Sequence, residues 1–400
     1  MKIAVIGAGA AGFMAAITAK ESDLHASVTI FEKTDKALSK VLVSGGGRCN
    51  VTNATFSIAQ LIKNYPRGGK ELKKSFNLFN TKHTIDWFKK KGVVLKTELD
   101  NRMFPSSNSS QTIVDLLINT AKDLNIRISF KSKVNLVKPF SNGIELTVNQ
   151  EVMFFNKVII ASGGTSRESG FDWLKRIDYK IIPPVPSLFT FNMPEDPITK
   201  LMGLSVPNVI TSIQGSVFKQ SGAILITHWG MSGPAILKLS SWGAKDLARR
   251  NYIFKTQINW LAIHEEELRN QLVSLEFNRR LIFNHNPFKI PKRLWQFILN
   301  KLEISENQIW SEISKKNKNR LINTLINDEY LVMGKTTFKE EFVSCGGIDL
   351  SEVNMLTMES KRHRGLFFAG ELLDIDAVTG GFNFQAAWTT GYLAGKNSVL

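Results

Sequence analysis

Residues 2–13 read KIAVIGAGAAGF, and this stretch decides the fold. Residues 2–6 are apolar and rich in β-branched side chains, as expected of a buried parallel strand. Residues 7–12 then follow the pattern G-x-G-x-x-G, and residues 13–20 are compatible with a helix. The first glycine permits a tight turn, the second lets a pyrophosphate approach the backbone, and the third lets the helix pack against the strand. The free N–H groups at the start of such a helix bind phosphate.

An acidic residue stands at the distance that a dinucleotide site requires. Residues 27–31 form a second expected strand, which ends at Glu32, 20 residues after Gly12. A carboxylate at this place accepts hydrogen bonds from a ribose hydroxyl. The strand, the glycine turn, the helix and the acid together predict a Rossmann-like α/β fold that binds a dinucleotide.

The same N-terminal stretch has a second interpretation. Residues 3–19 carry no charge and follow Lys2, as a secretory signal would. The run is short for a membrane span, which needs about 20 apolar residues. The strand-turn-helix interpretation accounts for more of its features. We therefore expect no membrane segment and a cytoplasmic protein.

Composition sets further bounds. The 400 residues are 43% hydrophobic and 22% charged, which is typical of globular proteins and not of disordered ones. Two cysteines, Cys49 and Cys345, exclude a disulfide scaffold and a multi-cysteine metal site, and we expect no metal. The net charge of +16 suits an anionic cofactor, substrate or surface.

Three further glycine-rich stretches lie far apart in the sequence. Residues 41–53 read VLVSGGGRCNVTN, where Arg48 supplies a permanent charge for a phosphate or a reduced flavin. Residues 158–164, VIIASGG, form a buried strand that closes on small residues. Residues 365–371, GLFFAGE, are a strand that ends in glycine and an acid, and they lead to TGGFN at 379–383 and a helix over 384–395.

These motifs resemble those of a known family. The arrangement is similar to the glutathione-reductase-type FAD fold. More closely, residues 44–53, 226–237, 357–361 and 365–388 resemble a bacterial family of NAD(P)/FAD-dependent oxidoreductases that includes aminoacetone oxidase and a bile-acid-pathway oxidoreductase. The resemblance covers the chain end to end and implies FAD as cofactor.

The resemblance also implies site residues. Those implied at the FAD pyrophosphate and adenosine ribose are Gly7, Gly9, Ala10, Ala11, Gly12, Glu32 and Lys33. Those implied to line the FAD site from the two middle motifs are Gly46, Gly47, Arg48, Cys49, Asn50, Ala161, Gly163 and Gly164. Val134, in an expected strand over 127–136, is implied at adenine. Those implied along the ribityl chain and the flavin ring are Gly370, Glu371, Asp374, Gly381, Phe382 and Asn383.

Two stretches depart from the family pattern. Residues 165–172 form a shorter loop than in relatives and lack its proline. Relatives carry Gly-Arg before an aromatic-Pro element, whereas this chain has Asn101 and Arg102. Because both changes concern the substrate side or the flavin environment, the resemblance leaves the substrate open.

The middle of the chain predicts an insertion. Residues 188–262 contain short β-like runs, and residues 263–329 have apolar residues at helical spacing. We expect an FAD domain made of residues 1–187 and 330–400, with a β-rich and a helical subdomain between them. Within the insert, His228 is a candidate contact to substrate or flavin, and Pro234 suits the first turn of a helix capped by Ser232.

The expected reaction is hydride transfer between the flavin and a small organic substrate. A helix starting at Gly381, or else Arg48, would stabilise negative charge on the flavin. A second G-x-G-x-x-G is missing from the sequence, so a dedicated nicotinamide domain is not expected. Either an amine reduces the flavin and oxygen reoxidises it, or NAD(P)H acts as a transient donor and an enone is reduced.

A third hypothesis is an FAD-holding, nucleic-acid-binding protein. Its support is the +16 charge and the aromatic residues Phe76, Phe79, Trp87 and Phe88 among lysines. Their helical spacing favours a place in the core instead, and we expect a small-molecule partner rather than a nucleic acid. The oligomeric state and a general base stay open.

Overall fold

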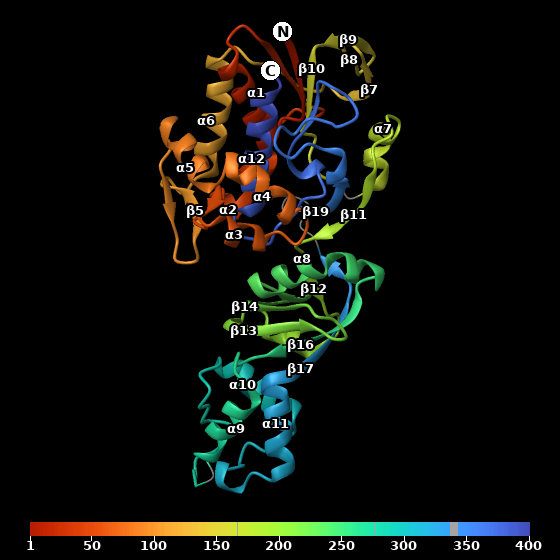
Figure 1. The fold of residues 1–400 in the computed structure, drawn as a ribbon. Coiled ribbons are helices and arrows are strands. Elements are labelled where there is room, and N and C mark those ends of the chain that lie inside the picture. Colours follow the sequence, from red (N-terminus) through yellow and green to blue (C-terminus); the bar gives the residue numbers. More distant parts are fainter. Residues whose placement is uncertain (166, 276, 337–342) are drawn as a thin grey trace. The chain divides into compact units, whose positions relative to one another are not determined.

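The computed structural model describes residues 1–400 except 166, 276 and 337–342 (Figure 1). Its contacts divide the chain into two compact units. Unit 1 comprises Met1–Ser187 and Phe338–Leu400, and unit 2 comprises Leu188–Thr337. Both units mix helices with sheets, and the α/β class expected from the sequence is confirmed.

Unit 1 is built on a parallel five-stranded sheet. The order β20-β10-β1-β2-β6 places β1 at the centre, where Val5 lies opposite Ile159 on one side and Ile30 on the other. The apolar side chains of β1 and β10 are buried, as a strand covered on both faces requires. The strands are β1 (Lys2–Ile6), β2 (Ser27–Phe31), β6 (Arg127–Ser129), β10 (Lys157–Ile160) and β20 (Leu366–Phe368).

Two helices from opposite ends of the chain, α1 and α12, pack against each other beside this sheet (Figure 1). Glycines make the close approach possible. A Cβ on Gly391 would lie 2.5 Å from the carbonyl oxygen of Ala11, and one on Gly395 would lie 2.2 Å from that of Ala15. The helices of unit 1 are α1 (Ala10–Ser22), α2 (Ser39–Gly47), α3 (Ile58–Leu61), α4 (Gly69–Leu78), α5 (Thr81–Lys90), α6 (Ser110–Asp123), α7 (Asp172–Lys175) and α12 (Phe382–Asn397).

The aromatic residues of α4 and α5 belong to the core. Phe76, Phe79, Trp87 and Phe88 are all buried. Phe88 packs edge-on against Trp388 of α12, with ring centroids 5.4 Å apart. The core interpretation of these residues is confirmed, and they are not available to stack on bases.

Three smaller sheets complete unit 1. One expectation about them is wrong: residues 127–136 are not one strand. The chain turns at Lys131, whose φ is +51°, so β6 ends in the parallel sheet and Val134 begins β7 of another sheet. The strands are β3 (Thr52–Asn53), β4 (Leu95–Thr97), β5 (Arg102–Pro105), β7 (Val134–Phe140), β8 (Gly143–Val148), β9 (Glu151–Phe155), β11 (Ile181–Ser187) and β19 (Val343–Ile348).

Unit 2 combines a seven-stranded sheet, in the order β17-β16-β13-β14-β15-β12-β18, with four helices. Its strands are β12 (Thr190–Asn192), β13 (Ser205–Ile213), β14 (Lys219–Thr227), β15 (Gly230–Ser232), β16 (Ile253–Asn259), β17 (Asp328–Met333) and β18 (Lys335–Thr336). Its helices are α8 (Pro234–Arg249), α9 (Glu265–Val273), α10 (Lys292–Lys301) and α11 (Lys315–Asn327).

The start of α8 agrees with the sequence in one respect and differs in another. Pro234 occupies the first turn, as expected. Ser232 does not cap the helix, because it lies in β15 and Gly233 takes the N-cap position with a φ of +98°. In the part of the chain that the structure describes, no helix has the length and hydrophobicity to cross a membrane.

Candidate cofactor site

The three motif glycines of residues 7–12 have the three distinct roles that the pattern predicts. A Cβ on Gly7 would lie 2.4 Å from the carbonyl oxygen of Ala161, and one on Gly12 would lie 1.9 Å from that of Gly7. Both glycines are therefore required by the packing of turn, strand and helix. At Gly9, by contrast, a Cβ would meet none of the described atoms within 4 Å, so space is open at this position.

This open space adjoins the N-terminus of α1. The first hydrogen bond of that helix runs from Phe13 N–H to the carbonyl of Gly9. The N–H groups of residues 10–12 therefore precede the helical hydrogen bonds and are available to a ligand. Open space, N–H donors and the positive end of a 13-residue helix fit a pyrophosphate.

Glu32 is fixed by three hydrogen bonds. Its Oε2 accepts one from the backbone N–H of Ala8 at 3.0 Å. Its Oε1 accepts from the backbone N–H and the hydroxyl of Thr34, both at 2.9 Å. Lys33 beside it is exposed, and Val134 begins β7, where it pairs with Val148. The acid is thus held at the glycine turn, where a ribose would meet it.

The SGGGRCN stretch forms the end of α2 and a left-handed turn. Gly45, Gly46 and Gly47 have φ values of +58°, +68° and +79°, which side chains other than glycine rarely adopt. Methyl groups placed on Gly46 and Gly47 would meet none of the described atoms within 4 Å. Cys49 follows with its thiol buried, and burial raises the pKa of that thiol to about 12.

The structure brings SGGGRCN next to TGGFN, although more than 300 residues separate them in the sequence. The amide of Asn50, oriented to satisfy both neighbours, donates to the carbonyl of Thr52 at 3.0 Å and accepts from Gly381 N–H at 2.9 Å. Asn53 Nδ2 donates to the carbonyl of Gly380 at 3.0 Å. These bonds position Gly381 as the N-cap of the 16-residue α12. The positive end of that helix therefore lies beside the glycine turn.

The side chains of the C-terminal motif chiefly support the backbone. Asp374 accepts a hydrogen bond from Gly346 N–H at 2.9 Å, and Glu371 accepts one from Ser344 N–H at 3.0 Å while pairing with Lys40. Asn383 bonds both backbone groups of Ala377.

Backbone groups around these side chains also take part. Gly370 N–H bonds Thr390 Oγ1 at 2.9 Å, the carbonyl of Phe382 accepts from the hydroxyl of Tyr65, and Ala161 N–H bonds the carbonyl of Ile6. At the end of β10, Gly163 has open space among the described atoms, whereas a Cβ on Gly164 would lie 2.8 Å from Glu371 Oε1. The expected site residues of this motif thus act mainly by shaping the chain.

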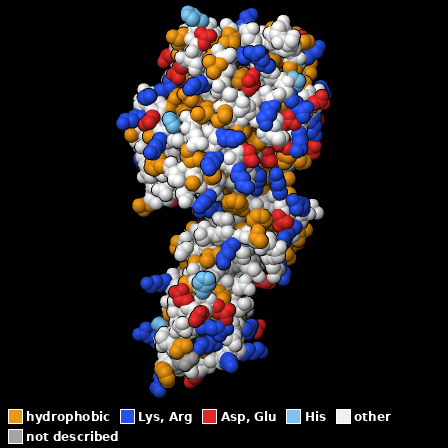
Figure 2. Space-filling model, in the orientation of Figure 1, with side chains coloured by type: hydrophobic (Ala, Val, Ile, Leu, Met, Phe, Trp, Pro, Cys, Tyr) orange, Lys and Arg blue, Asp and Glu red, His pale blue; other side chains and the backbone are white. Residues whose placement is uncertain are grey.

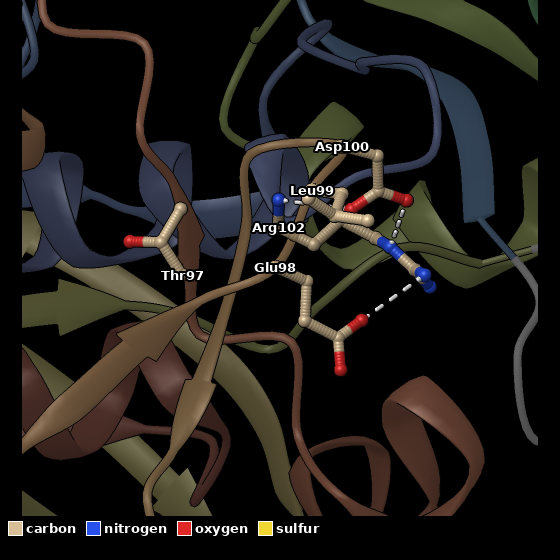
Figure 3. A pocket seen from close by; sticks show the side chains of 5 residues that line it. All are labelled: Thr97, Glu98, Leu99, Asp100 and Arg102. Carbon is tan, nitrogen blue, oxygen red and sulfur yellow. Dashed lines mark hydrogen bonds and ion pairs between the residues drawn. The ribbon is translucent and has the colours of Figure 1, made fainter.

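Arg48 is held by a hairpin that the sequence did not connect with it. Its guanidinium bonds Glu98 at 2.6 Å and lies over the ring of Phe104, 4.0 Å from the centroid. Glu98 and Asp100 also pair with Arg102, at 3.3 and 2.6 Å (Figure 3). The chain of alternating charges lines a pocket at the tip of the hairpin formed by β4 and β5. Charges that alternate over residues 98–102 were the available signal.

The departure at Asn101 preserves the backbone geometry of that hairpin. Asn101 has a φ of +65° and donates its backbone N–H to the carbonyl of Glu98 at 2.9 Å. Glycine adopts this left-handed conformation most easily, and asparagine is the most tolerant of the other residues together with aspartate. The difference from relatives therefore changes a side chain at the pocket and not the turn.

A buried ion pair was also missed. Arg67 binds Asp376 through two nitrogens, and Ser187 Oγ donates to the same carboxylate at 2.7 Å. Burial raises the pKa of Asp376, and Arg67 and Ser187 oppose that shift by stabilising the anion. The pair joins segments far apart in the sequence and has a structural role.

His228 and Trp229 lie in unit 2. His228 is exposed and its ring meets that of Trp229 edge-on, with centroids 4.4 Å apart. Trp229 Nε1 donates to Thr190 Oγ1 at 3.0 Å. The tryptophan is therefore anchored to β12, and the histidine ring is free to contact a ligand.

Fold and site together define the class: an enzyme of the FAD-dependent oxidoreductases, with a Rossmann-like cofactor domain. The chain belongs to the HI0933-like family, whose Rossmann-domain description matches residues 1–397.

Curated relatives match along nearly their whole length. The ribosomal RNA dihydrouridine synthase of Escherichia coli is 27% identical over 99% of this chain and 97% of its own, and that of Haemophilus influenzae is 28% identical over 97% and 96%. A 3-dehydro-bile acid delta(4,6)-reductase of Clostridium scindens is 27% identical over 99% and 98%.

Solved structures share the fold. A 3-ketosteroid delta1-dehydrogenase from Sterolibacterium denitrificans superposes with a TM-score of 0.54 at 11% identity, over 99% of both chains. The quinol fumarate reductase subunit FrdA of E. coli superposes with a TM-score of 0.52 at 14% identity, over 100% of this chain and 70% of its own.

Proposed function

We propose that this enzyme reduces a carbon–carbon double bond conjugated to a carbonyl group, and that its substrate is a uracil base in ribosomal RNA. The observation that carries the proposal is the likeness, over 96% or more of each chain, to two relatives named ribosomal RNA dihydrouridine synthase. The bond reduced in forming dihydrouridine is the C5=C6 bond of uracil, which is conjugated to the C4 carbonyl. The net charge of +16 suits an RNA substrate.

The third relative supports the same chemistry on another substrate. Its name describes a reductase of double bonds at positions 4 and 6 of a 3-dehydro, hence 3-oxo, bile acid. Such bonds are conjugated to a carbonyl, as in uracil. This likeness favours a small enone as the second candidate substrate. An amine substrate with oxygen as acceptor stays a prediction.

The residues present fit FAD, and each would act in binding or positioning. When bound, FAD supplies hydride transfer through its flavin ring. The open space at Gly9 and the N–H groups of residues 10–12 would hold the pyrophosphate, and Glu32 would hold the ribose. The α12 N-terminus at Gly381 would stabilise negative charge on the flavin.

The overall reaction requires a donor of two electrons. Uracil gains a hydride and a proton across C5=C6, and NAD(P)H is converted to NAD(P)⁺ while one proton is taken from solvent. We propose NAD(P)H as a transient donor, because the sequence contains one G-x-G-x-x-G and that one fits FAD.

The test uses the holoprotein and ribosomal RNA from cells that lack the gene. The protein should release FAD rather than FMN on denaturation. With NADH or NADPH it should convert a uridine of that RNA to dihydrouridine, read as a mass gain of two hydrogens after nuclease digestion. RNA that stays unmodified, while an enone is reduced or an amine bleaches the flavin anaerobically, would replace the proposed substrate by that compound.

A further inference from the structure

The helical part of unit 2 carries a basic surface at one end. Residues 277–280 and 313–320 together contain six Lys and Arg residues and no Asp or Glu. The structure places the two segments side by side, since Trp310 N–H bonds the carbonyl of Arg280 and Ser311 N–H bonds that of Asn278, at 3.2 and 2.9 Å. Figure 2 shows Lys and Arg side chains over α11.

We call this surface the α11 tip. Its residues are Phe277, Arg279, Arg280, Lys315, Lys316 and Arg320, and all are exposed. Glu312 is an acidic residue beside them. Charge of one sign predominates here, although a solvated helix would be expected to mix both signs.

The charge of α11 runs against the helix dipole. Lys315 and Lys316 occupy its first turn, which holds no acidic residue. Basic groups at the positive end of a helix destabilise it. The neighbouring α9 follows the usual preference, with Glu265–Glu267 in its first turn. A local arrangement that opposes stability in this way is typical of functional sites.

An exposed aromatic residue completes the surface. The side chain of Phe277 is 93% exposed, next to Arg279 and Arg280. Burying an aromatic ring is favourable, so a ring left in water is available to a partner. Aromatic rings among basic residues bind single-stranded nucleic acid, because bases stack on the ring and phosphates pair with the cations.

Resting on the proposed RNA substrate, we infer that the α11 tip docks a single-stranded or loop segment of ribosomal RNA. The phosphates meet the four cations of Arg279, Arg280, Lys315 and Lys316, and a base stacks on Phe277. The surface provides affinity for a large RNA and takes no part in the redox reaction.

The test compares two variants of the holoprotein. In the tip variant Arg279, Arg280, Lys315 and Lys316 are changed to Ala. In the control variant the same number of exposed cations is removed from α4 and α5 of unit 1, by changing Lys73, Lys74, Lys89 and Lys90 to Ala. Binding to a ribosomal RNA transcript is measured over a range of salt concentrations. FAD content and melting temperature verify that both variants are folded.

We expect the tip variant to bind the transcript about tenfold or more weakly. Its plot of log affinity against log salt should be less steep by about 3, since each phosphate contact on a single strand contributes about 0.7. Phe277→Ser should weaken binding about fivefold or more with the slope unchanged, because stacking releases no counterions. The control variant should bind as the wild type does.

Turnover separates docking from chemistry. On the transcript, the tip variant should show a raised KM and an unchanged kcat, and on a short uridine-containing oligonucleotide it should match the wild type. Wild-type affinity in the tip variant, or an equal loss in the control variant, would overturn the docking surface. So would tip-dependent binding to phosphatidylglycerol vesicles without binding to RNA. If the wild type forms no dihydrouridine yet the tip variant alone loses RNA, the docking surface stands and the proposed reaction falls.

Discussion

Glu32 Oε2 accepts a hydrogen bond of 3.0 Å from the backbone N–H of Ala8, so the acid after β2 and the glycine turn after β1 fix each other. The two segments belong to neighbouring parallel strands, whose carboxyl ends lie at one edge of the sheet. A carboxylate that orders the turn and also accepts from a ribose has two effects, which mutation can separate.

We expect Glu32→Ala to lower both FAD affinity and the stability of the apoprotein. A hydrogen bond to a charged group contributes about 1.5–3 kcal/mol, and the alanine loses the bonds from Ala8 and Thr34 as well as those to the cofactor. Glu32→Gln keeps an acceptor oxygen and should lose less. FAD titration and thermal unfolding measure the two effects, with Lys33→Ala as the exposed neighbouring control. Wild-type FAD affinity in Glu32→Ala would remove this residue from the site.

Gly9 and Gly12 should respond differently to added side chains. Gly9→Val should fold and lose FAD, because the new side chain occupies space that is open in the chain itself. Gly12→Ala should unfold at a lower temperature, because its Cβ would lie 1.9 Å from the carbonyl oxygen of Gly7. Melting temperature and bound FAD per chain distinguish the two. Full FAD content in Gly9→Val would show that this turn does not hold the cofactor.

Arg48 should act through its charge and its fixed position. Arg48→Ala should lower FAD affinity or the flavin potential, and Arg48→Lys should restore part of the effect, since lysine keeps the charge but loses the fork-shaped contact. Glu98→Gln should shift these quantities less than Arg48→Ala, because the pair is partly exposed and worth about 1 kcal/mol or less. If Arg48→Ala matches the wild type in occupancy, potential and turnover, the guanidinium serves only the hairpin.

Cys49 should be unreactive in the native protein. Burial raises the pKa of its thiol to about 12, from 9.0 for a free thiol, so protonation is favoured at every pH below that value. At pH 8 the thiolate fraction is roughly 10⁻⁴, and the thiolate is the form that reacts. In a Cys345→Ser background, iodoacetamide at pH 8 should label Cys49 only after unfolding. Rapid labelling of the folded protein would indicate an accessible thiolate in the SGGGRCN motif.

The insert should influence substrate reduction and not FAD binding. His228→Ala should change the rate at which the oxidised substrate reoxidises the flavin, because its ring is exposed next to the anchored Trp229. Trp229→Phe keeps an aromatic ring and loses the bond to Thr190. Rapid-mixing absorbance at the flavin band measures both variants. Unchanged rates would remove this turn from the substrate site, and loss of FAD would place it at the cofactor.

Local patterns in the sequence were sufficient for the core of the cofactor domain. The alternation of a β-branched run, G-x-G-x-x-G and an acid 20 residues on depends on contacts between neighbouring strands, and the strands β1 and β2 follow it. Pro234 and the buried aromatics of α4 and α5 were likewise predictable, because helix starts and apolar periodicity are local properties.

Pairings between distant segments needed the tertiary structure. Neither the bond from Asn50 to Gly381 nor the grip of Glu98 on Arg48 follows from spacing, because each depends on how separate turns meet in space. The break between β6 and β7 was missed for the same reason: both strands are apolar enough to read as one, and only the left-handed turn at Lys131 divides them. The sequence by itself thus determined which residue types surround the cofactor, through patterns of backbone conformation. Only the folded chain decided which side chains hold one another there, since those contacts join residues up to more than 300 positions apart.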